Sequence, residues 1–402
     1  MKKVIIIGGG AAGFFTAINI KENNPEIAVT ILEKGKEVLQ KVKVSGGGRC
    51  NVTHACFEPK ELVKFYPRGE KELLGPFHQF MTGDVFEWFE NRGVPLKIEA
   101  DNRVFPEANT SQAIVDCFTN AVDNLGIDLL TGCGVNSIYQ QENQWVVNAK
   151  EQQFLADYVV IAAGSSAKIW EMASDLGHTI IPTVPSLFTF KIKDQRIVDL
   201  LGLSVPNATV KLVSTKLESS GPLLITHWGL SGPAVLKLSA FGARILADKN
   251  YQYNVEVNWL SRSTEKVFNV LLNLKKKEPR KTVILKSPFT DIPKRLWERL
   301  VYASTINDQQ NWADLSNLKL EMLANQLTNG IFNANGKSTF KEEFVTAGGI
   351  DLKEINFKRF ESKIHKNLFF VGEILNIDAV TGGFNFQNAW TGSFIAARAI
   401  SE

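Results

Sequence analysis

The fold of this 402-residue chain is decided by residues 3–33, KVIIIGGGAAGFFTAINIKENNPEIAVTILE. The stretch begins with an apolar run, residues 4–7, that is typical of a strand buried on both faces. Small and apolar residues then recur at helical intervals from Ala11 to Ile20, and residues 27–32 predict a second strand. The order of strand, helix and strand predicts the first unit of an α/β fold with a parallel sheet.

Three glycines between the first strand and the helix have the spacing G-x-G-x-x-G: Gly8, Gly10 and Gly13. In this pattern the first glycine makes a tight turn, the second lets the backbone approach a pyrophosphate, and the third lets helix and strand pack closely. Glu33 lies twenty residues past Gly13, where an acid accepts hydrogen bonds from a ribose and disfavours a 2′-phosphate. A glycine-rich turn without a ligand is the alternative, but the complete strand, helix and acid pattern favours a dinucleotide site.

The bulk composition is that of a soluble globular protein, with 44% hydrophobic and 22% charged residues. The length predicts two or three domains. The net charge of +3 and the lack of an arginine-rich stripe argue against nucleic acid as the main partner. We expect neither a signal sequence nor a membrane span, and therefore a cytoplasmic protein. The four cysteines and five histidines lack metal-site spacing, so we expect free thiols and no metal.

A second glycine cluster, SGGGRCN at residues 45–51, follows a basic linker. Three successive glycines make a poor helix and a poor core, but they expose backbone N–H groups to a neighbour. A flexible solvent loop is the alternative interpretation. The Arg, Cys and Asn that follow the glycines favour a loop that lies against a ligand.

Two further apolar runs end in polar or glycine residues, as strands of a ligand-binding parallel sheet do. Residues 158–164, YVVIAAG, end in glycine, and residues 368–373, LFFVGE, end in Gly-Glu. The segment TGGFNFQN, residues 381–388, then precedes a predicted helix over residues 389–400. We expect the last sixty residues to complete the cofactor domain, which makes the middle of the chain an insertion.

The predicted organisation therefore has four parts. Residues 1–186 form the first part of the cofactor domain, 187–260 a β-rich subdomain and 261–330 a helical subdomain. Residues 331–402 return through the β-rich subdomain and complete the cofactor domain. In the first part we expect helices over 82–91 and 111–124 and an antiparallel meander over 135–158; in the β-rich part, strands over 187–192, 210–213 and 253–259 and a helix over 234–245. The basic run at Lys275–Lys277, with Arg280 and Lys281, fits either a phosphate site or a solvated helix end, and the latter is favoured.

With these segments assembled, the chain resembles the glutathione-reductase-like FAD flavoproteins, and within them the BaiN/YhiN family, also described as aminoacetone-oxidase-type. The matching segments span nearly the whole chain: Gly8 to Gly13, SGGGRCN, Phe105-Pro106, THWGLSGP (226–233), TAGGID (346–351) and Gly372 to Gln387. The resemblance implies a Rossmann-like FAD domain (the GR2 type), interrupted by a β-barrel-like subdomain and a small helical one.

The resemblance also implies which residues bind FAD. They are Gly8, Gly10, Ala12, Gly13, Glu33, Lys34, Lys41, Ser45, Gly47, Gly48, Arg49, Cys50, Asn51, Val135, Ala163, Gly164, Gly372, Glu373, Asp378, Gly383, Phe384 and Asn385. The adenosine and pyrophosphate would lie along Val135 and the residues of this set from Gly8 to Lys34. SGGGRCN would run beside the flavin, and Gly383 to Asn385 would place backbone donors at its carbonyl edge. The linker departs from the family pattern at Gln40, which puts a role for that residue in doubt.

These observations predict an FAD-dependent oxidoreductase acting on a small organic substrate. Either NAD(P)H or the substrate would give a hydride to the flavin. No second G-x-G-x-x-G follows a strand, so any NAD(P)H would dock transiently. The alternatives are an amine oxidase that uses O₂, a tRNA-modifying flavoprotein, and a flavin-binding regulatory protein. The substrate and the oligomeric state are not predicted.

Three residues are candidates for chemistry beyond cofactor binding. His227 precedes a glycine-rich turn and a helix, and it fits either a proton donor or a buried structural histidine. Arg49 fits charge compensation for reduced flavin or for an anionic substrate. Cys50 could be a redox thiol, but no partner is evident, and packing against the flavin is favoured.

Overall fold

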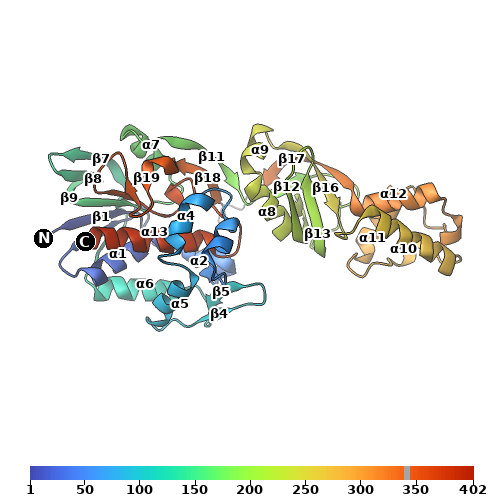
Figure 1. Cartoon of the computed structure of the whole chain (residues 1–402), viewed down its shortest axis with the longest axis horizontal. Coiled ribbons are helices and arrows are strands. Elements are labelled where there is room, and N and C mark those ends of the chain that lie inside the picture. Colours follow the sequence, from blue (N-terminus) through green and yellow to red (C-terminus); the bar gives the residue numbers. More distant parts are fainter. Residues whose placement is uncertain (339–344) are drawn as a thin grey trace. The chain divides into compact units, whose positions relative to one another are not determined.

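The computed structural model describes residues 1–338 and 345–402, and these divide into two compact units. The first unit comprises residues 1–184 and 345–402, and the inserted unit comprises residues 185–338. The first unit is thus built from both ends of the chain, the blue-to-green and red segments of Figure 1.

A seven-stranded sheet forms the centre of the first unit, in the order β19-β20-β21-β10-β1-β2-β6. Its parallel strands are β1 (Lys3–Ile7), β2 (Ala28–Leu32), β6 (Asp128–Leu130), β10 (Tyr158–Ile161) and β21 (Leu368–Phe370), and β19 (Ile355–Asn356) and β20 (Glu361–Ser362) form an antiparallel edge. Strand order reverses at β1, which is where open α/β sheets bind ligands. The predicted fold class is confirmed.

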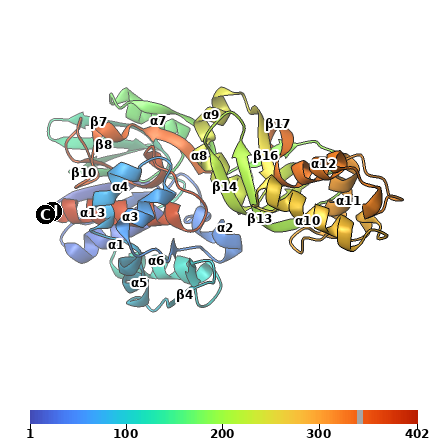
Figure 2. The same ribbon diagram turned by 45° about the vertical axis from the view of Figure 1, so that its right-hand side comes forward.

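Two helices from opposite ends of the chain lie side by side on this sheet, α1 (Ala11–Asn23) and α13 (Phe384–Ser401) (Figures 1 and 2). Aromatic rings pack around their contact. The ring of Phe15 lies 4.5 Å from that of Trp88 and 5.1 Å from that of Trp390. A hydrogen bond of 3.0 Å from Ser393 Oγ to the carbonyl of Ala12 joins the two helices directly.

The remaining elements of the first unit surround this core. They are α2 (Gln40–Gly48), β3 (Thr53–His54), α3 (Pro59–Leu62), η1 (Val63–Phe65), α4 (Glu70–Phe77), α5 (Thr82–Glu90), β4 (Leu96–Ile98), β5 (Arg103–Pro106), α6 (Gln112–Asn124), β7 (Val135–Gln141), β8 (Gln144–Ala149), β9 (Gln152–Ala156), α7 (Ala167–Asp175), β11 (Ile180–Ser186), β18 (Val345–Ile350), η4 (Leu352–Glu354) and η5 (Gly372–Ile374). Strands β7 to β9 form the predicted antiparallel meander.

The inserted unit contains a closed barrel in the order β12-β15-β14-β13-β16-β17. Its strands are β12 (Thr189–Ile192), β13 (Ser204–Leu212), β14 (Glu218–Thr226), β15 (Gly229–Ser231), β16 (Gln252–Asn258) and β17 (Gly330–Ser338), with α8 (Pro233–Phe241) and α9 (Ala243–Asp248) packed on it. Alternate residues of β16, Tyr253, Val255 and Val257, are buried in the core, as the two-residue period of a strand requires.

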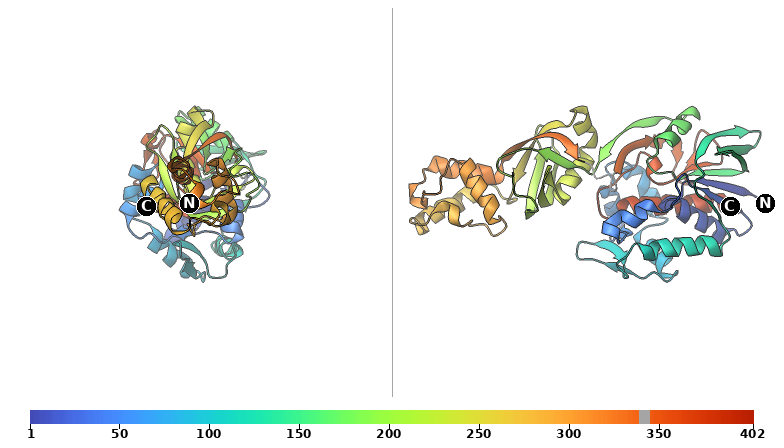
Figure 3. Two further views of the ribbon diagram at one scale, coloured as in Figure 1. Left: turned by 90° about the vertical axis from the view of Figure 1, so that its right-hand side faces the viewer. Right: turned by 180° about the vertical axis from the view of Figure 1, so that it is seen from behind.

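A helical group is inserted between β16 and β17. It consists of α10 (Thr264–Lys277), η2 (Val283–Leu285), α11 (Lys294–Ala303), η3 (Trp312–Asp314) and α12 (Asn317–Thr328). In the right-hand view of Figure 3 these orange helices gather at one end of the yellow-green barrel. The fully buried Trp297 anchors the group, since its indole N–H donates to the carbonyl of Val283 at 3.0 Å.

Two predictions for the inserted unit were wrong in detail. Strand β14 was missed because Gly221 and Pro222 interrupt its apolar pattern, and a break of this kind normally marks a turn. The helix predicted over residues 234–245 is split into α8 and α9 at Gly242. Within residues 1–338 and 345–402 no helix has the length and hydropathy needed to span a bilayer.

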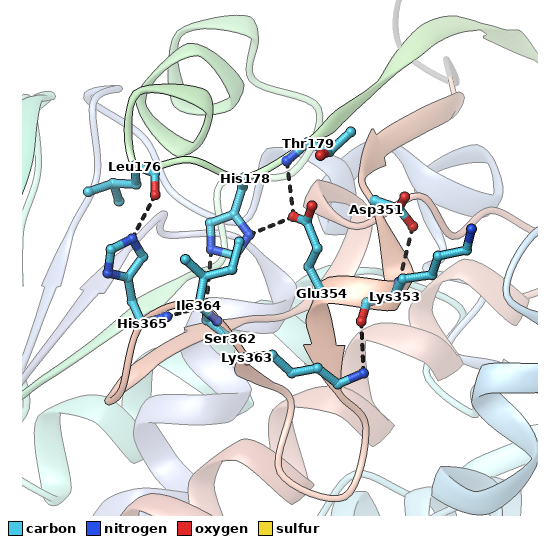
Figure 4. A network of polar contacts seen from close by, with 10 residues as sticks. All are labelled: Leu176, His178, Thr179, Asp351, Lys353, Glu354, Ser362, Lys363, Ile364 and His365. Carbon is cyan, nitrogen blue, oxygen red and sulfur yellow. Dashed lines mark hydrogen bonds and ion pairs between the residues drawn. The ribbon is translucent and has the colours of Figure 1, made fainter.

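A buried histidine joins the loop after α7 to the edge strands of the first unit (Figure 4). His178 Nδ1 lies 3.0 Å from Glu354 Oε2, and its Nε2 lies 3.1 Å from Ser362 Oγ. This order resembles a catalytic triad, but Ser362 Oγ also accepts the N–H groups of Ile364 and His365, at 3.0 and 2.9 Å. The serine is buried and its lone pairs are engaged, so the cluster stabilises the fold.

We expect this network to make the first unit less stable in mild acid. Burial lowers the pKa of His178 below its ordinary 6.5, against the opposing effect of Glu354. As the pH falls through 6.5, His178 becomes protonated in the unfolded chain but stays neutral in the folded chain. The free energy of unfolding therefore decreases until the pH reaches the folded-state pKa of His178. Thermal melts between pH 7.5 and 5 should show this loss, and a His178→Asn variant should show a shallower one. Equal slopes would mean that His178 does not couple to folding.

Candidate functional site

The glycine turn after β1 is packed too tightly for any other residue at two of its positions. Gly8 has φ +119°, and a Cβ there would lie 2.5 Å from the carbonyl oxygen of Ala162. A Cβ on Gly13 would lie 2.0 Å from the carbonyl oxygen of Gly8. The turn therefore fixes the start of α1 directly against the ends of β1 and β10.

Gly10 is different, because an added Cβ would meet no atom of the described residues within 4 Å. It is the N-cap of α1, and no side chain in the described part of the protein caps this helix start. The first N–H groups of α1 thus face open space with the positive end of a helix dipole, which is the arrangement that holds a pyrophosphate. The role of the motif stays a prediction, and the open space at Gly10 leaves room for the phosphates of a dinucleotide.

Glu33 lies at the end of β2, next to the glycine turn. Its two carboxylate oxygens accept the N–H groups of Gly9 and Gly35, both at 2.7 Å. These bonds fix the side chain at the sheet edge and leave further lone pairs for ribose hydroxyls. The segment before β7 lies alongside, since Cys133 N donates to the carbonyl of Glu33 at 2.8 Å. The buried Val135 follows it closely, while Lys34 is exposed.

The ends of β10 and β21 bring a third group of predicted residues to the same sheet edge. A Cβ on Gly164 would lie 3.9 Å from Glu373 Oε2, and Ala163 adjoins it. Glu373 forms an ion pair with Lys41, whose side chain is 55% exposed. A Cβ on Gly372 would lie 3.3 Å from that of Ala12, so this turn packs onto the first turn of α1.

The SGGGRCN segment forms an irregular turn at the end of α2. Helix α2 is assigned through Gly48, but Ser45, Gly46 and Gly47 have non-helical backbone angles. All three glycines have positive φ, and a Cβ on Gly47 or Gly48 would meet no described atom within 4 Å. The expected non-helical loop is present at Ser45 to Gly47, and its open glycine face leaves room for a bound group.

Arg49 contacts the segment that contains β4 and β5. Its guanidinium lies 2.6 Å from Glu99 Oε1 and 3.9 Å from the ring centre of Phe105. The charge of Arg49 is therefore already balanced by Glu99 in this structure.

Cys50 is fully buried directly after the glycine turn, with φ +62°. Burial raises the pKa of this thiol to about 12, so it is neutral at physiological pH. A neutral, enclosed thiol is a poor nucleophile. The described cysteines are all free.

We expect Cys50 to resist alkylation in the native protein. At pH 8, iodoacetamide should label the half-buried Cys56 first and should reach Cys50 only after unfolding. Peptide mass spectrometry of native and denatured samples measures the difference. A Cys56→Ser variant serves as the control and should take up almost no label in its native state. Native labelling of Cys50 would contradict the burial argument.

Asn51 joins the glycine turn to the start of α13. With its amide oriented to satisfy its neighbours, Oδ1 accepts the N–H of Gly383 at 3.0 Å and Nδ2 donates to the carbonyl of Thr53 at 3.0 Å. Thr53 Oγ1 in turn donates to Gln387 Oε1 at 2.6 Å, in the buried interior. A Cβ on Gly383 would lie 2.4 Å from the carbonyl oxygen of Thr53, so only glycine fits there.

Helix α13 begins at this junction without a side-chain cap from the described residues. The ring of Phe384 stacks on Phe65 at 4.2 Å, and its carbonyl accepts the hydroxyl of Tyr66 at 2.6 Å. Asn385 holds the preceding loop through two hydrogen bonds with the backbone of Ala379, at 3.0 and 3.3 Å. The free N–H groups of this helix start form a second positive backbone terminus in the same unit.

A predicted FAD-binding residue, Asp378, and two residues that were not predicted, Arg68 and His54, hold this arrangement together. Asp378 is fully buried and pairs through both carboxylate oxygens with Arg68. His54 stacks on Phe384 at 4.5 Å, and its Nδ1 is buried without a hydrogen-bond partner in the described chain. Burial lowers the pKa of His54. Arg68 and His54 have only one signal in the sequence, their proximity to SGGGRCN, and the residues after that segment lack a regular pattern.

His227 belongs to the inserted unit, in the turn between β14 and β15. Its side chain is exposed, so the interpretation as a buried structural histidine was wrong. The other predicted site residues all belong to the first unit.

The chain matches a known protein family over nearly its whole length. The model of the family described as "HI0933-like protein Rossmann domain" matches residues 2–399. The ribosomal RNA dihydrouridine synthase of Haemophilus influenzae is 27% identical over 99% of this chain and 98% of its own length. The 3-dehydro-bile acid delta(4,6)-reductase of Clostridium scindens is 27% identical over the full length of both chains. A ribosomal RNA dihydrouridine synthase of Escherichia coli is 26% identical over 98% of this chain and 96% of its own.

Among solved structures, the 3-ketosteroid delta1-dehydrogenase of Sterolibacterium denitrificans is similar across 100% of both chains, with a TM-score of 0.53 and 12% identity. At this identity the similarity concerns the fold alone. It supports the arrangement of a Rossmann-like unit interrupted by an insertion.

Proposed function

The chain belongs to the HI0933-like family of FAD-dependent oxidoreductases, and from this premise we propose that it reduces a carbon–carbon double bond conjugated to a carbonyl group. The observation that carries the proposal is the chemistry shared by relatives that match the whole chain. Dihydrouridine arises when the C5=C6 bond of uracil, conjugated to the C4 carbonyl, is saturated. A 3-oxo steroid with double bonds at positions 4 and 6 presents the same conjugated unit.

The reaction adds a hydride to the carbon β to the carbonyl and a proton to the α carbon. NAD(P)H supplies the two electrons and becomes NAD(P)⁺. A bound FAD, held at Gly10 and Glu33, would supply the hydride-transfer chemistry between NAD(P)H and the alkene. Without a second dinucleotide motif, the nicotinamide docks only transiently.

The residues of the first unit provide binding, orientation and electrostatics for this chemistry. The N-terminus of α1 at Gly10 binds the pyrophosphate, and Glu33 orients the ribose. The N-terminus of α13 would stabilise negative charge on a bound flavin. Asn51 keeps this helix start in register with the SGGGRCN turn, because it bonds the N–H of Gly383.

We further propose a uracil within RNA as the substrate, rather than a free small molecule. The inserted unit, residues 185–338, contains 21 Lys and Arg against 12 Asp and Glu, a net charge of +9. The described residues of the first unit contain 23 against 28, a net charge of −5. The overall charge of +3 therefore conceals a strongly basic part, and a basic domain is the electrostatic signature of a polyanionic partner.

An anaerobic absorbance titration tests the proposed function. NADH or NADPH should bleach the flavin band near ~450 nm. Uracil-containing ribosomal RNA should then restore the band and accumulate dihydrouridine, and a 3-oxo-4,6-diene steroid should be far less effective. If an amine bleaches the flavin, nicotinamides do not, and air alone restores it, the protein is an oxidase and the proposal fails.

A further inference from the structure

The proposed function leaves the lysine-rich end of α10 unused. We call Lys276, Lys277 and Arg280 the basic tip. From the sequence alone, a solvated helix end was the favoured interpretation, because cations stabilise the C-terminus of a helix. The structure shows that the tip has two features which that interpretation does not require.

The first feature is a set of hydrogen bonds that hold the loop after α10 in place. The loop after α10 runs antiparallel to the segment at η3, where Trp312 N donates to the carbonyl of Lys281 at 3.0 Å and Ala313 N donates to the carbonyl of Pro279 at 2.9 Å. Lys275 Nζ donates to a backbone carbonyl of the same segment. The basic tip is thus held at both ends instead of trailing into solvent.

The second feature is unbalanced charge. Lys281 pairs with Glu278 at 2.9 Å. Lys276, Lys277 and Arg280 are exposed, and the described residues offer none of them an ion-pair partner. The helix dipole accounts for the two lysines in the last turn of α10, but Arg280 lies three residues past the end of that helix.

Two exposed apolar side chains lie near the end of α11 and the start of α12. Tyr302 is 51% exposed near the end of α11, and Leu318 is 66% exposed in the first turn of α12. Lys319 Nζ donates to the carbonyl of Thr305 at 2.9 Å, which joins these two helix ends. The helical group thus offers exposed aromatic surface as well as exposed cations, and proteins use these two features together to stack unpaired bases and to neutralise their phosphates.

We propose that the basic tip binds the phosphate backbone of RNA. This proposal deepens the proposed function and rests on RNA as the substrate. The charge balance supports it, because residues 261–329 contain 12 Lys and Arg against 7 Asp and Glu. The tip gives the affinity and orientation that a flavin site alone cannot supply, since phosphate contacts position a nucleic acid without reading its sequence.

The test compares the holoenzyme with a K276A/K277A/R280A variant. The probe is a fluorescent RNA hairpin with uracils in its loop, and its dissociation constant is measured by anisotropy at several KCl concentrations. Three lost phosphate contacts should reduce the slope of log K against log salt by about two to three, and should weaken binding at least about tenfold at low salt. A K193A/K216A/K249A variant removes the same charge from exposed barrel positions and should retain most of the affinity.

Each outcome discriminates. Bound FAD and its reduction by NAD(P)H should be unchanged in both variants, and their far-UV circular dichroism should match that of the wild type, which shows that both units fold. If both variants bind RNA like the wild type, or both lose it equally, the basic tip is not the site, although the substrate proposal survives. If the wild type binds no RNA and RNA does not reoxidise its flavin, the substrate proposal itself fails. Binding of the tip to anionic phosphatidylglycerol vesicles, with RNA binding unaffected, would replace RNA with a lipid surface.

Discussion

A Gly10→Ala variant is expected to fold like the wild type and yet to be purified almost without FAD. Its new Cβ would meet no described atom of the protein within 4 Å, and the backbone of Gly10, at φ −95° and ψ −170°, suits alanine. The methyl group would instead occupy the space in front of α1 where a pyrophosphate approaches. We expect FAD affinity to fall on the order of 100-fold, about 2.7 kcal/mol. Flavin content and calorimetric titration of the apoprotein measure the loss.

Gly13→Ala is the matched comparison, because the same methyl group would lie 2.0 Å from the carbonyl oxygen of Gly8. Here the backbone itself must move, so we expect the apoprotein to lose at least about 3 kcal/mol of stability or to fail to fold. If Gly10→Ala binds FAD normally, the pyrophosphate does not lie at this helix start, and the interpretation of the site is wrong.

Apart from the glycine substitutions, we expect Arg68→Met to cause the largest decrease in the free energy of unfolding. Asp378 is fully buried and its carboxylate pairs with Arg68, whose side chain is only 13% exposed. Removal of the cation leaves a buried charge without its main partner, which costs about 3–5 kcal/mol. Chemical unfolding of the apoprotein measures the change without a contribution from FAD binding.

Lys41→Met provides the control, because it also removes one partner of an ion pair. Lys41 is 55% exposed and pairs with Glu373, so we expect a change of no more than about 1 kcal/mol. A double variant, Arg68→Met with Asp378→Leu, should recover part of the stability, because no buried charge remains. Equal effects of Arg68→Met and Lys41→Met would show that burial does not determine the strength of these pairs.

The elements of the first unit with strong periodic patterns were predictable from sequence. The strand, glycine turn and helix at residues 4–20 require only local information, and the sheet placed them as expected. Gly10 was identified from spacing alone; its surroundings are open, and its role in binding stays a prediction. The SGGGRCN turn was also anticipated, because three glycines exclude a regular helix.

Contacts between distant segments were not predictable. Asn51 bonds Gly383, Arg68 pairs with Asp378, and no local pattern indicates either partner. The net charge of the whole chain did not show that one unit is basic and the other acidic, because their opposite charges largely cancel. The expectation that nucleic acid is not a partner rested on that net charge, and relatives that act on ribosomal RNA now favour the opposite proposal.

The split construction of the first unit has a consequence for synthesis on the ribosome. Strand β10 pairs with β21 through Val159 and Leu368, and α13 follows β21. The central sheet therefore cannot be completed until β21 has emerged, whereas the barrel segment between β10 and β21 is released earlier and has its own core. We therefore expect FAD to bind only after β21 has emerged, and a nascent chain in which the barrel but not β21 has left the ribosome should contain a folded barrel and no flavin.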